Sequence, residues 1–230
     1  WKTIERERCT VVLGVPTIWK MLLDAPEFQK VALDCVRWLI SGGAPLPASI
    51  SEAYEQRGLV LKQGYGMTEV GVNCFTMTAE ESRTKRGSIG RPMLFTEVEL
   101  RDAGGAVVKV GEVGEMYIRG PHVSTGYWAN PLETAQNYLE GGWFRTGDLA
   151  RMDEDGFFYI AGRRKEMFIS GGVNVYPAEI EAELVLHPSV SDAAVVAVPD
   201  ETWGEAGVAF VVSRGVTGEE LAEYLALRIA

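Results

Sequence analysis

The stretch CTVVLGVPTIWKMLL, residues 9–23, places a short apolar run rich in β-branched side chains directly before a proline and a helical pattern. The first six residues favour a strand, and Pro16 suits the first turn of a helix, where its missing N–H would have no partner. The alternation continues with a strand over VRWLIS (36–41), a helix over ASISEAYEQRG (48–58) and a strand over LVLKQG (59–64). Strands alternating with helices predict a parallel α/β section.

Residues 86–164 have a different pattern, in which turn signals rather than helices separate the strands. Strands are predicted over EVELRD (97–102), AVVKVG (106–111) and GEMYIRG (114–120). DLARMD and FFYIAGR, on either side of EDG, predict a further hairpin. We therefore expect an antiparallel, barrel-like sheet in this section.

A third pattern begins at Arg163. It predicts a hairpin across Gly171–Gly172, a helix from Pro177, and strands over SDAAVVAVPD (191–200) and GVAFVVS (207–213). A capping box and apolar residues at helical spacing predict one more helix. The residues concerned are Thr217, Glu220, Leu221, Leu225 and Ile229. This third section is therefore expected to be a small α+β domain.

Composition and charge exclude several classes of function. A hydrophobic content of 47% can fill a core, and a net charge of −10 opposes binding to nucleic acid or anionic lipid over most of the surface. No long apolar run occurs and the N-terminus lacks a signal-peptide pattern, so we expect a cytoplasmic protein without a transmembrane segment. Three cysteines without CxxC spacing suggest neither a disulfide framework nor a zinc site, so we expect reduced, mostly buried thiols. With only two histidines, a histidine-rich metal centre is excluded.

Two glycine-containing loops come directly after predicted strands. SGGAP (41–45) and GYGMTE (64–69) lie beyond the second and third strands of the parallel section, where ligands of open parallel sheets bind. In the second loop Tyr65 could stack on a base, Thr68 could donate to a phosphate oxygen and Glu69 could hold Mg²⁺, which prefers oxygen ligands. An ordinary strand-to-helix turn explains the loop equally well.

Two further motifs carry side chains suited to a nucleotide. Asp148 of TGD can accept two hydrogen bonds from a ribose diol, and Arg163 of GRRKEMF can bind ribose or phosphate oxygens through its planar fork. Each has an ordinary explanation when considered alone. Aspartate commonly caps a turn, and a run of charges is usually a solvated linker.

The order of the motifs is more specific than any one of them. The chain contains, in sequence, VPTIWKMLL, SGGAP, GYGMTE, GEMYIRGP, GWFRTGD, GRRKEMFISGGVNVYPAEIE and HPSVSDAAVVAVPDETWGE. This series resembles the core motifs of the adenylate-forming superfamily, specifically its acyl-CoA synthetases, over essentially the whole chain. The resemblance implies an AMP-forming acid–CoA ligase, which uses ATP and Mg²⁺ to convert a carboxylic acid to an acyl-adenylate and then transfers the acyl group to coenzyme A.

The resemblance also implies a division into two domains. Residues 1–164 would form the C-terminal part of a large adenylate-forming domain, and residues 165–230 an incomplete, mobile C-terminal domain. Lys165 matches the hinge about which the small domain would rotate between the two half-reactions. The rotation would bring backbone near Gly171 and Gly172 to the narrow pantetheine arm of coenzyme A.

The same resemblance assigns a nucleotide site. Thr68 would touch the α-phosphate and Glu69 would ligate Mg²⁺. Asp148 would bind both ribose hydroxyls, with Arg163 beside it. The remaining ATP or AMP contacts would be Gly43, Ala44, Pro45, Tyr65, Gly66 and Met67.

Several alternatives stay open at the level of the substrate and of the whole protein. Gly71, in the expected acid pocket, leaves room for an aryl group or an aliphatic chain. The segment ISGGVNVYPAEIE resembles fatty-acyl and aryl-CoA ligases more than peptide-synthetase adenylation domains. Within the family we expect a ligase for medium-chain or long-chain fatty acids, with an aryl or cinnamate-type ligase as the alternative. Partners beyond the acid, ATP and coenzyme A are not indicated, although a homo-oligomer is compatible with the sequence.

The resemblance further implies that this chain is a fragment. The family's phosphate-binding loop and its C-terminal catalytic lysine are not found among the 230 residues, so we expect that the chain by itself cannot complete adenylation. A non-catalytic protein that binds nucleotide is the alternative from another class. An α/β-hydrolase would need GxSxG, which is absent.

Overall fold

The computed structural model describes residues 1–229, which divide into two compact units. Unit 1 comprises residues 1–146 and 151–160, and unit 2 comprises residues 147–150 and the chain from residue 161 onward. The boundary therefore runs through two strands, β8 (Trp143–Met152) and β9 (Phe158–Arg163).

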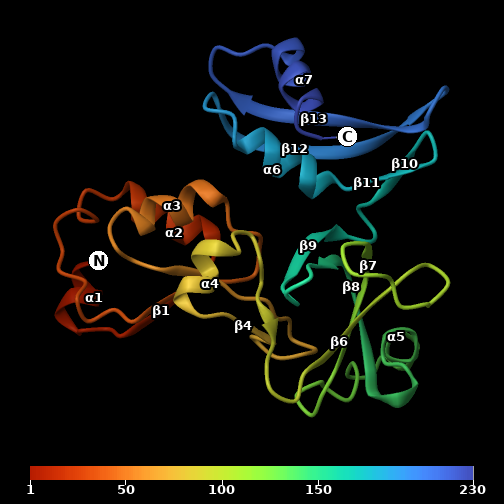
Figure 1. The fold of residues 1–230 in the computed structure, drawn as a ribbon, viewed down its shortest axis with the longest axis horizontal. Helices are drawn as coiled ribbons and strands as arrows, with labels where there is room; N and C mark the ends of the chain where they lie inside the picture. The colour runs from red at the N-terminus through yellow and green to blue at the C-terminus, as the bar shows by residue number, and fades with distance from the viewer. Residues whose placement is uncertain (230) are drawn as a thin grey trace. The chain divides into compact units, whose positions relative to one another are not determined.

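Unit 1 begins with a three-stranded parallel sheet in the order β1-β2-β3 (Figure 1). The strands are β1 (Val11–Gly14), β2 (Trp38–Ser41) and β3 (Leu61–Gln63), and the helices are α1 (Lys2–Arg6), α2 (Pro16–Asp24) and α3 (Ala48–Glu55). The predicted parallel α/β section is confirmed, including the helix that begins at Pro16.

The core of this section is built around Trp19 of α2, which is completely buried. Its indole ring lies edge-to-face against Tyr54 of α3 with ring centroids 5.7 Å apart, and the Tyr54 hydroxyl donates to the Trp19 carbonyl oxygen at 2.9 Å. Leu39 of β2 and Leu61 of β3 are direct neighbours in the sheet and belong to the same cluster. This packing holds both helices on one face of the sheet and fixes the strand ends.

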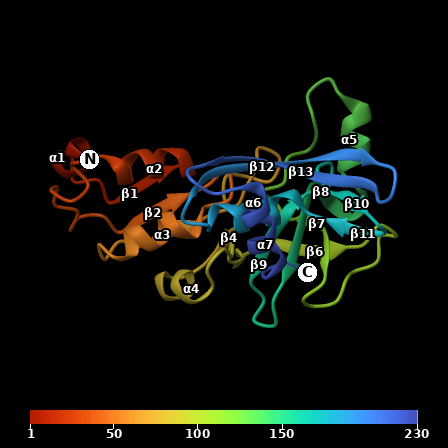
Figure 2. The same ribbon diagram turned by 90° about the horizontal axis from the view of Figure 1, so that it is seen from above.

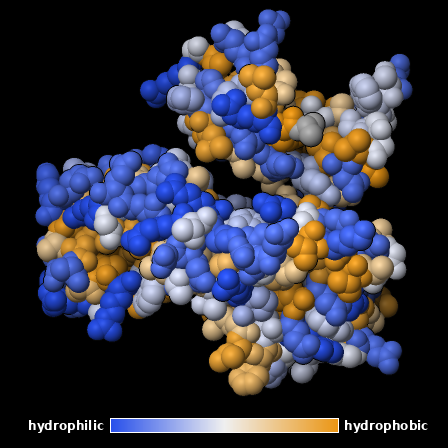
Figure 3. Space-filling model, viewed as in Figure 1, coloured by the Kyte–Doolittle hydropathy of each residue, from blue (hydrophilic) through white to orange (hydrophobic). Residues whose placement is uncertain are grey.

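Strand β1 lies at the edge of this sheet, and its outer side chains are exposed. Val12 packs against the core, whereas Val11 and Leu13 point to the other face and are 46% and 67% exposed. Figure 3 shows apolar surface over the region of α1 and β1.

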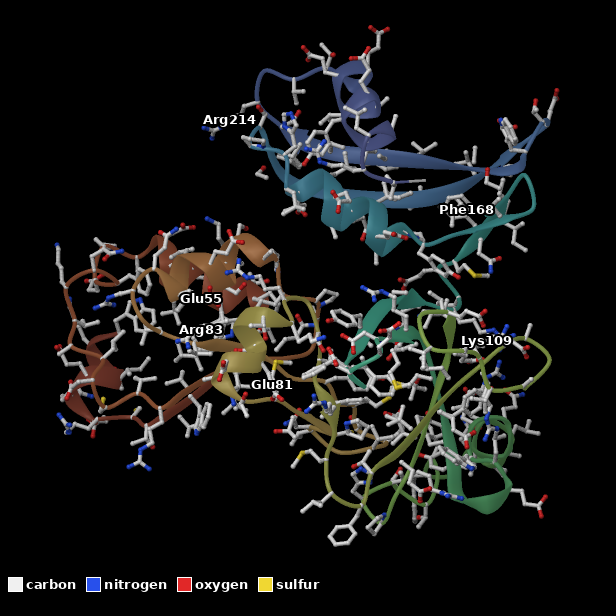
Figure 4. All side chains as sticks on the ribbon, viewed as in Figure 1. Glu55, Glu81, Arg83, Lys109, Phe168 and Arg214 are labelled. Atoms are coloured by element: carbon white, nitrogen blue, oxygen red, sulfur yellow. The ribbon has the colours of Figure 1, made fainter. Side chains whose placement is uncertain are left out.

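Short elements connect the parallel sheet to the next one. Strands β4 (Phe75–Thr76) and β5 (Arg91–Pro92) pair antiparallel on either side of α4 (Ala79–Thr84). Glu81 of α4, labelled in Figure 4, forms a capping box with Thr78 and an ion pair with Arg91 at 3.0 Å.

The second half of unit 1 contributes to a four-stranded sheet in the order β6-β7-β8-β9. Its further elements are β6 (Glu97–Arg101), β7 (Val113–Arg119), α5 (Pro131–Asn137) and the 3₁₀ turn η1 (Glu140–Gly142). β6 and β7 pair antiparallel, so the antiparallel character of this section is confirmed.

The strand predicted over residues 106–111 was wrong. The Asp102 carboxylate accepts hydrogen bonds from the N–H groups of Gly104 and Ala106 at 2.8 and 2.9 Å, which fixes a tight turn. After it the chain keeps only an isolated bridge between Arg101 and Val107. The local aspartate contacts thus replace the alternating pattern with a loop.

Unit 2 contains an antiparallel sheet in the order β11-β10-β13-β12. Its strands are β10 (Phe168–Ser170), β11 (Val173–Val175), β12 (Val190–Asp200) and β13 (Gly204–Ser213), and its helices are α6 (Pro177–Val185) and α7 (Gly218–Ala226). The predicted hairpin, the helix from Pro177 and the capping box of the last helix are confirmed. Helix α7 ends before Ile229, so that residue does not extend its apolar face.

The core of unit 2 lies between the long β12–β13 hairpin and its two helices (Figure 2). Phe168 from β10, labelled in Figure 4, is buried in the same core cluster as Leu184 of α6 and Leu221 of α7. A Cβ atom at Gly207 would lie 3.0 Å from the Phe168 ring. Glycine at that position lets the aromatic ring approach the backbone of β13.

Candidate functional site

The loops after β2 and β3 are joined by backbone hydrogen bonds. The Gly42 N–H donates to the Gly14 carbonyl at 3.1 Å, and the Gly64 N–H donates to the Ser41 carbonyl at 2.8 Å. Gly43 has a φ of +83°, a conformation that favours glycine. The ends of the three parallel strands therefore meet at one edge, where SGGAP and the start of GYGMTE lie together.

Residues 65–74 fold into a closed loop that leads from β3 to strand β4, and not into the ordinary strand-to-helix turn that the sequence also allowed. The Met67 N–H donates to the Gly71 carbonyl at 3.1 Å, and the Cys74 N–H donates to the Tyr65 carbonyl at 2.9 Å. A Cβ atom at Gly66 would lie 2.3 Å from the Gly71 carbonyl oxygen, closer than any real contact. This closure leaves Thr68 exposed.

We expect Gly66→Ala to lower the free energy of unfolding by about 1–3 kcal/mol, because the added methyl group must displace the backbone of Gly71 and Val72. Chemical denaturation followed by tryptophan fluorescence measures this. Gly218→Ala is the matched control, since its Cβ atom would meet nothing within 4 Å. Similar unfolding free energies for the two variants would contradict the close approach at Gly66.

The carboxylate of Glu69 is held by a second loop. The Tyr127 hydroxyl donates to Glu69 Oε1 at 2.8 Å, and the Ser124 N–H donates to the Glu69 carbonyl oxygen at 2.8 Å. Burial, followed by the hydrogen bond to Glu69, raises the pKa of Tyr127, so its hydroxyl remains a donor at neutral pH. Both the backbone and the side chain of Glu69 are therefore fixed.

Tyr127 is in turn fixed by contacts with helix α5 and the residue directly after that helix. Thr134 Oγ1 accepts a hydrogen bond from the Tyr127 N–H at 2.9 Å. The rings of Tyr127 and Tyr138 lie edge-to-face with centroids 5.6 Å apart, and the Tyr138 hydroxyl is 2.6 Å from Ser124 Oγ. Sequence reasoning missed Tyr127, for which the only available signal was an aromatic residue directly after a glycine in STGYW.

Asp148 lies within strand β8 rather than in a turn, and it is only 5% exposed. Arg163 Nε donates to Asp148 Oδ1 at 2.8 Å, from the last residue of β9. The Arg164 N–H donates to the Gly147 carbonyl at 2.9 Å. The structure thus pairs Asp148 with Arg163 and places both in regular strands, not in a solvated linker.

Lys165 is exposed in the turn that joins β9 to β10. The turn is closed by hydrogen bonds from the N–H groups of Glu166 and Met167 to the Arg163 carbonyl, at 3.0 and 3.1 Å. The Lys165 side chain is therefore not part of either core.

Gly171 and Gly172 form the tight turn between β10 and β11, with φ values of +56° and +86°. The Gly171 N–H donates to the Trp203 carbonyl at 2.9 Å, and a Cβ atom at Gly171 would lie 2.6 Å from the Trp203 ring. A Cβ atom at Gly172 would meet nothing within 4 Å. The fold itself therefore accounts for the glycine at 171, whereas the space beside Gly172 is open.

Residues 1–128 match the AMP-binding enzyme family, and residues 179–230 match the AMP-binding enzyme C-terminal domain. The first match covers more than half of the chain. The chain belongs to the AMP-binding enzyme family. The resemblance to adenylate-forming enzymes and the mixed α/β fold class expected from the motifs are thereby confirmed.

Two curated relatives of this chain are named as CoA ligases or synthases. A feruloyl-CoA synthase of an Amycolatopsis species is 44% identical over 230 residues, covering 99% of this chain and 47% of that protein. A long-chain-fatty-acid–CoA ligase of Mycobacterium tuberculosis is 38% identical over 232 residues, covering 100% of this chain and 46% of that protein. The chain thus spans about half the length of the curated relatives it matches.

A solved relative of this chain has the same fold over the whole of the matched region. It is an o-succinylbenzoate coenzyme A synthetase from Bacillus subtilis, solved in complex with ATP and magnesium ion. The similarity has a TM-score of 0.89 at 33% identity and covers 100% of this chain and 47% of that one.

Cys9, Cys35 and Cys74 are all free thiols. Cys74 is buried, and burial raises the pKa of its thiol to about 11, whereas Cys9 and Cys35 are half-buried. The expectation of mostly buried thiols was therefore right only for Cys74.

Within residues 1–229, no cluster of three or more His, Cys, Asp or Glu residues could hold a metal ion. In the same part of the chain, no helix has the length and apolar character needed to span a membrane.

Proposed function

We propose that the whole protein is an ATP-dependent acid–CoA ligase. It would form an acyl-adenylate with release of pyrophosphate and then transfer the acyl group to the thiol of coenzyme A. The observation that carries the proposal is the GYGMTE loop at the carboxyl end of the parallel sheet, where Thr68 is exposed and the Glu69 carboxylate is fixed. The two curated relatives, both named for CoA thioester formation, support it.

The side chains of the nucleotide site would have separate roles in this reaction. Thr68 would donate to the α-phosphate, and Asp148 would accept hydrogen bonds from the ribose hydroxyls while Arg163 holds its carboxylate in place. Because the carboxylate substrate and the phosphate are both anionic, donors that neutralise the developing charge lower the barrier. Holding the two reactants in line adds a proximity effect. Gly43, Ala44, Pro45 and Tyr65 would line the adenine side, and Gly66 and Met67 would make further contacts with ATP or AMP.

Glu69 fits the role of a Mg²⁺ ligand. Mg²⁺ takes oxygen ligands and is commonly held by one or two carboxylates together with substrate phosphates, so a cluster of protein ligands is not required. Tyr127 engages Oε1, and within residues 1–229 no donor to Oε2 is found. A bound cation would supply neutralisation of phosphate charge. The solved relative with ATP and magnesium ion supports this assignment.

We also propose that Lys165 marks the hinge between a large domain over residues 1–164 and a small domain from residue 165 onward. Because the turn at Lys165 is exposed, its backbone angles can change without loss of core packing, and this supports the hinge. In the thioester-forming state, the backbone of Gly171 and Gly172 would approach the pantetheine arm of coenzyme A, for which the open space beside Gly172 leaves room.

The acid belongs to one of two classes. A medium-chain or long-chain fatty acid is the first, and an aryl or cinnamate-type acid is the second, which gains support from the feruloyl-CoA synthase relative. With either acid, the use of ATP and coenzyme A is in keeping with a cytoplasmic location.

The test is a panel of acids with the whole protein. We expect AMP release that depends on both ATP and coenzyme A, at least about tenfold above the rate without acid, with either palmitate and octanoate or ferulate and cinnamate. EDTA should abolish it, because the phosphate charge would no longer be neutralised. Release of ADP would contradict the proposal. ATP binding without turnover of any acid would instead favour a non-catalytic nucleotide-binding protein.

A further inference from the structure

Tyr127 links two loops that are 58 residues apart in the sequence, and it does so through the carboxylate of Glu69. We propose that Tyr127 is a positioning residue: it holds Oε1 of Glu69 so that the other carboxylate oxygen is presented to the cation bound with ATP. The proposal rests on the proposed function, because it assigns a role within that same site.

The structure fixes Glu69 at two points, one on its backbone and one on its carboxylate. The Ser124 N–H holds the backbone carbonyl of Glu69, and the Tyr127 hydroxyl holds the end of its side chain, both at 2.8 Å. A glutamate side chain otherwise samples several rotamers, and ordering them on binding costs free energy. With one oxygen held in advance, this cost is removed before the nucleotide arrives.

The support behind Tyr127 is rigid. Its N–H is held by Thr134 of α5, and its ring packs edge-to-face on Tyr138. Gly126 has a φ of +145°, and a Cβ atom there would lie 2.7 Å from the Thr134 methyl group. Glycine at 126 therefore lets the chain approach α5 closely enough to place the tyrosine hydroxyl on Glu69.

The experiment removes only the hydroxyl, with Tyr127→Phe in the whole protein. Calorimetry without the acid substrate measures the affinity for ATP in saturating Mg²⁺ and in EDTA. We expect the affinity in Mg²⁺ to fall about tenfold, as for the loss of a hydrogen bond to a charged group, while the affinity in EDTA is unchanged. The Mg²⁺ concentration that gives half-maximal pyrophosphate exchange should rise by a similar factor, with the KM for the acid unchanged.

Tyr159→Phe is the matched control. The Tyr159 hydroxyl also donates to a carboxylate, Asp153 Oδ2 at 3.2 Å, but that pair lies outside the proposed site. This variant should keep the Mg²⁺ dependence of the wild type. In a Glu69→Gln background, Tyr127→Phe should cause no further loss, because the carboxylate that it positions is gone.

The outcomes separate the two proposals. If the wild type binds ATP with a Mg²⁺ dependence that Tyr127→Phe leaves unchanged, the positioning role is wrong and the proposed function stands. A fall in affinity that is equal in Mg²⁺ and EDTA, or that accompanies a lower melting temperature in both tyrosine variants, shows a structural role and also overturns the positioning role. If the wild type binds no ATP and releases no AMP, both proposals fail.

Discussion

Asp148→Ala is expected to lower kcat/KM for ATP in pyrophosphate exchange by about two to four orders of magnitude. Asp148 is 5% exposed and would accept hydrogen bonds from both ribose hydroxyls, and a hydrogen bond to a charged group contributes about 1.5–3 kcal/mol. The substitution also leaves the Arg163 guanidinium without the carboxylate that it contacts at 2.8 Å. Initial rates at varied ATP concentration, with saturating acid, measure the effect.

A substrate analogue separates loss of ribose binding from general damage to strand β8. The wild type should use 2′-deoxy-ATP much less well than ATP, whereas Asp148→Ala should use the two nucleotides about equally, because the acceptor for the 2′-hydroxyl is gone. A variant that still discriminates between them as well as the wild type would show that Asp148 does not bind the ribose. Circular dichroism of the variant checks that the strand is retained.

Lys165→Pro is expected to reduce coenzyme A-dependent thioester formation by about a hundredfold while leaving pyrophosphate exchange within about threefold of the wild type. Proline fixes φ near −65° and disfavours the helical region for the preceding residue, here Arg164, so the turn could no longer change its backbone angles. Lys165 is exposed, so the substitution removes no core packing. Separate assays of the two half-reactions measure the effect.

The control for this hinge is Lys165→Ala, which removes the side chain but leaves both backbone angles free. It should keep both half-reactions, since the proposed role belongs to the backbone. Equal loss of adenylation and thioester formation in Lys165→Pro would refute the hinge assignment. A large loss of thioester formation in Lys165→Ala would move the role from the backbone to the ammonium group.

Local signals predicted most of the elements correctly. Pro16 begins helix α2 and Pro177 begins helix α6, because proline at the first helical position needs no hydrogen-bond partner. Thr217 and Glu220 form the capping box that the sequence predicts. Such features depend on residues three or fewer positions apart, so they can be recognised without knowledge of the fold.

The parts that could not be predicted depend on competing local contacts or on contacts between distant positions, which these signals do not report. The Asp102 carboxylate turns a strand-like pattern into a loop by accepting two backbone hydrogen bonds, and alternation of polarity does not reveal that competition. The contact between Tyr127 and Glu69 joins positions 58 residues apart, so nothing near either residue points to the other. Glu69 itself could be singled out because a carboxylate is a residue type that Mg²⁺ accepts as a ligand, and its role stays a prediction.

Strand β1, with its exposed apolar side chains at the edge of the parallel sheet, has a practical consequence for the isolated 230-residue chain. Within residues 1–229, β1 is an edge strand of its sheet, and an edge strand with exposed apolar side chains, here Val11 and Leu13, is a template for pairing with a second molecule. The net charge of −10 opposes such self-association through repulsion, and added salt screens that repulsion. Aggregation of the chain should therefore be governed by ionic strength and protein concentration, with β1 as the place where it begins.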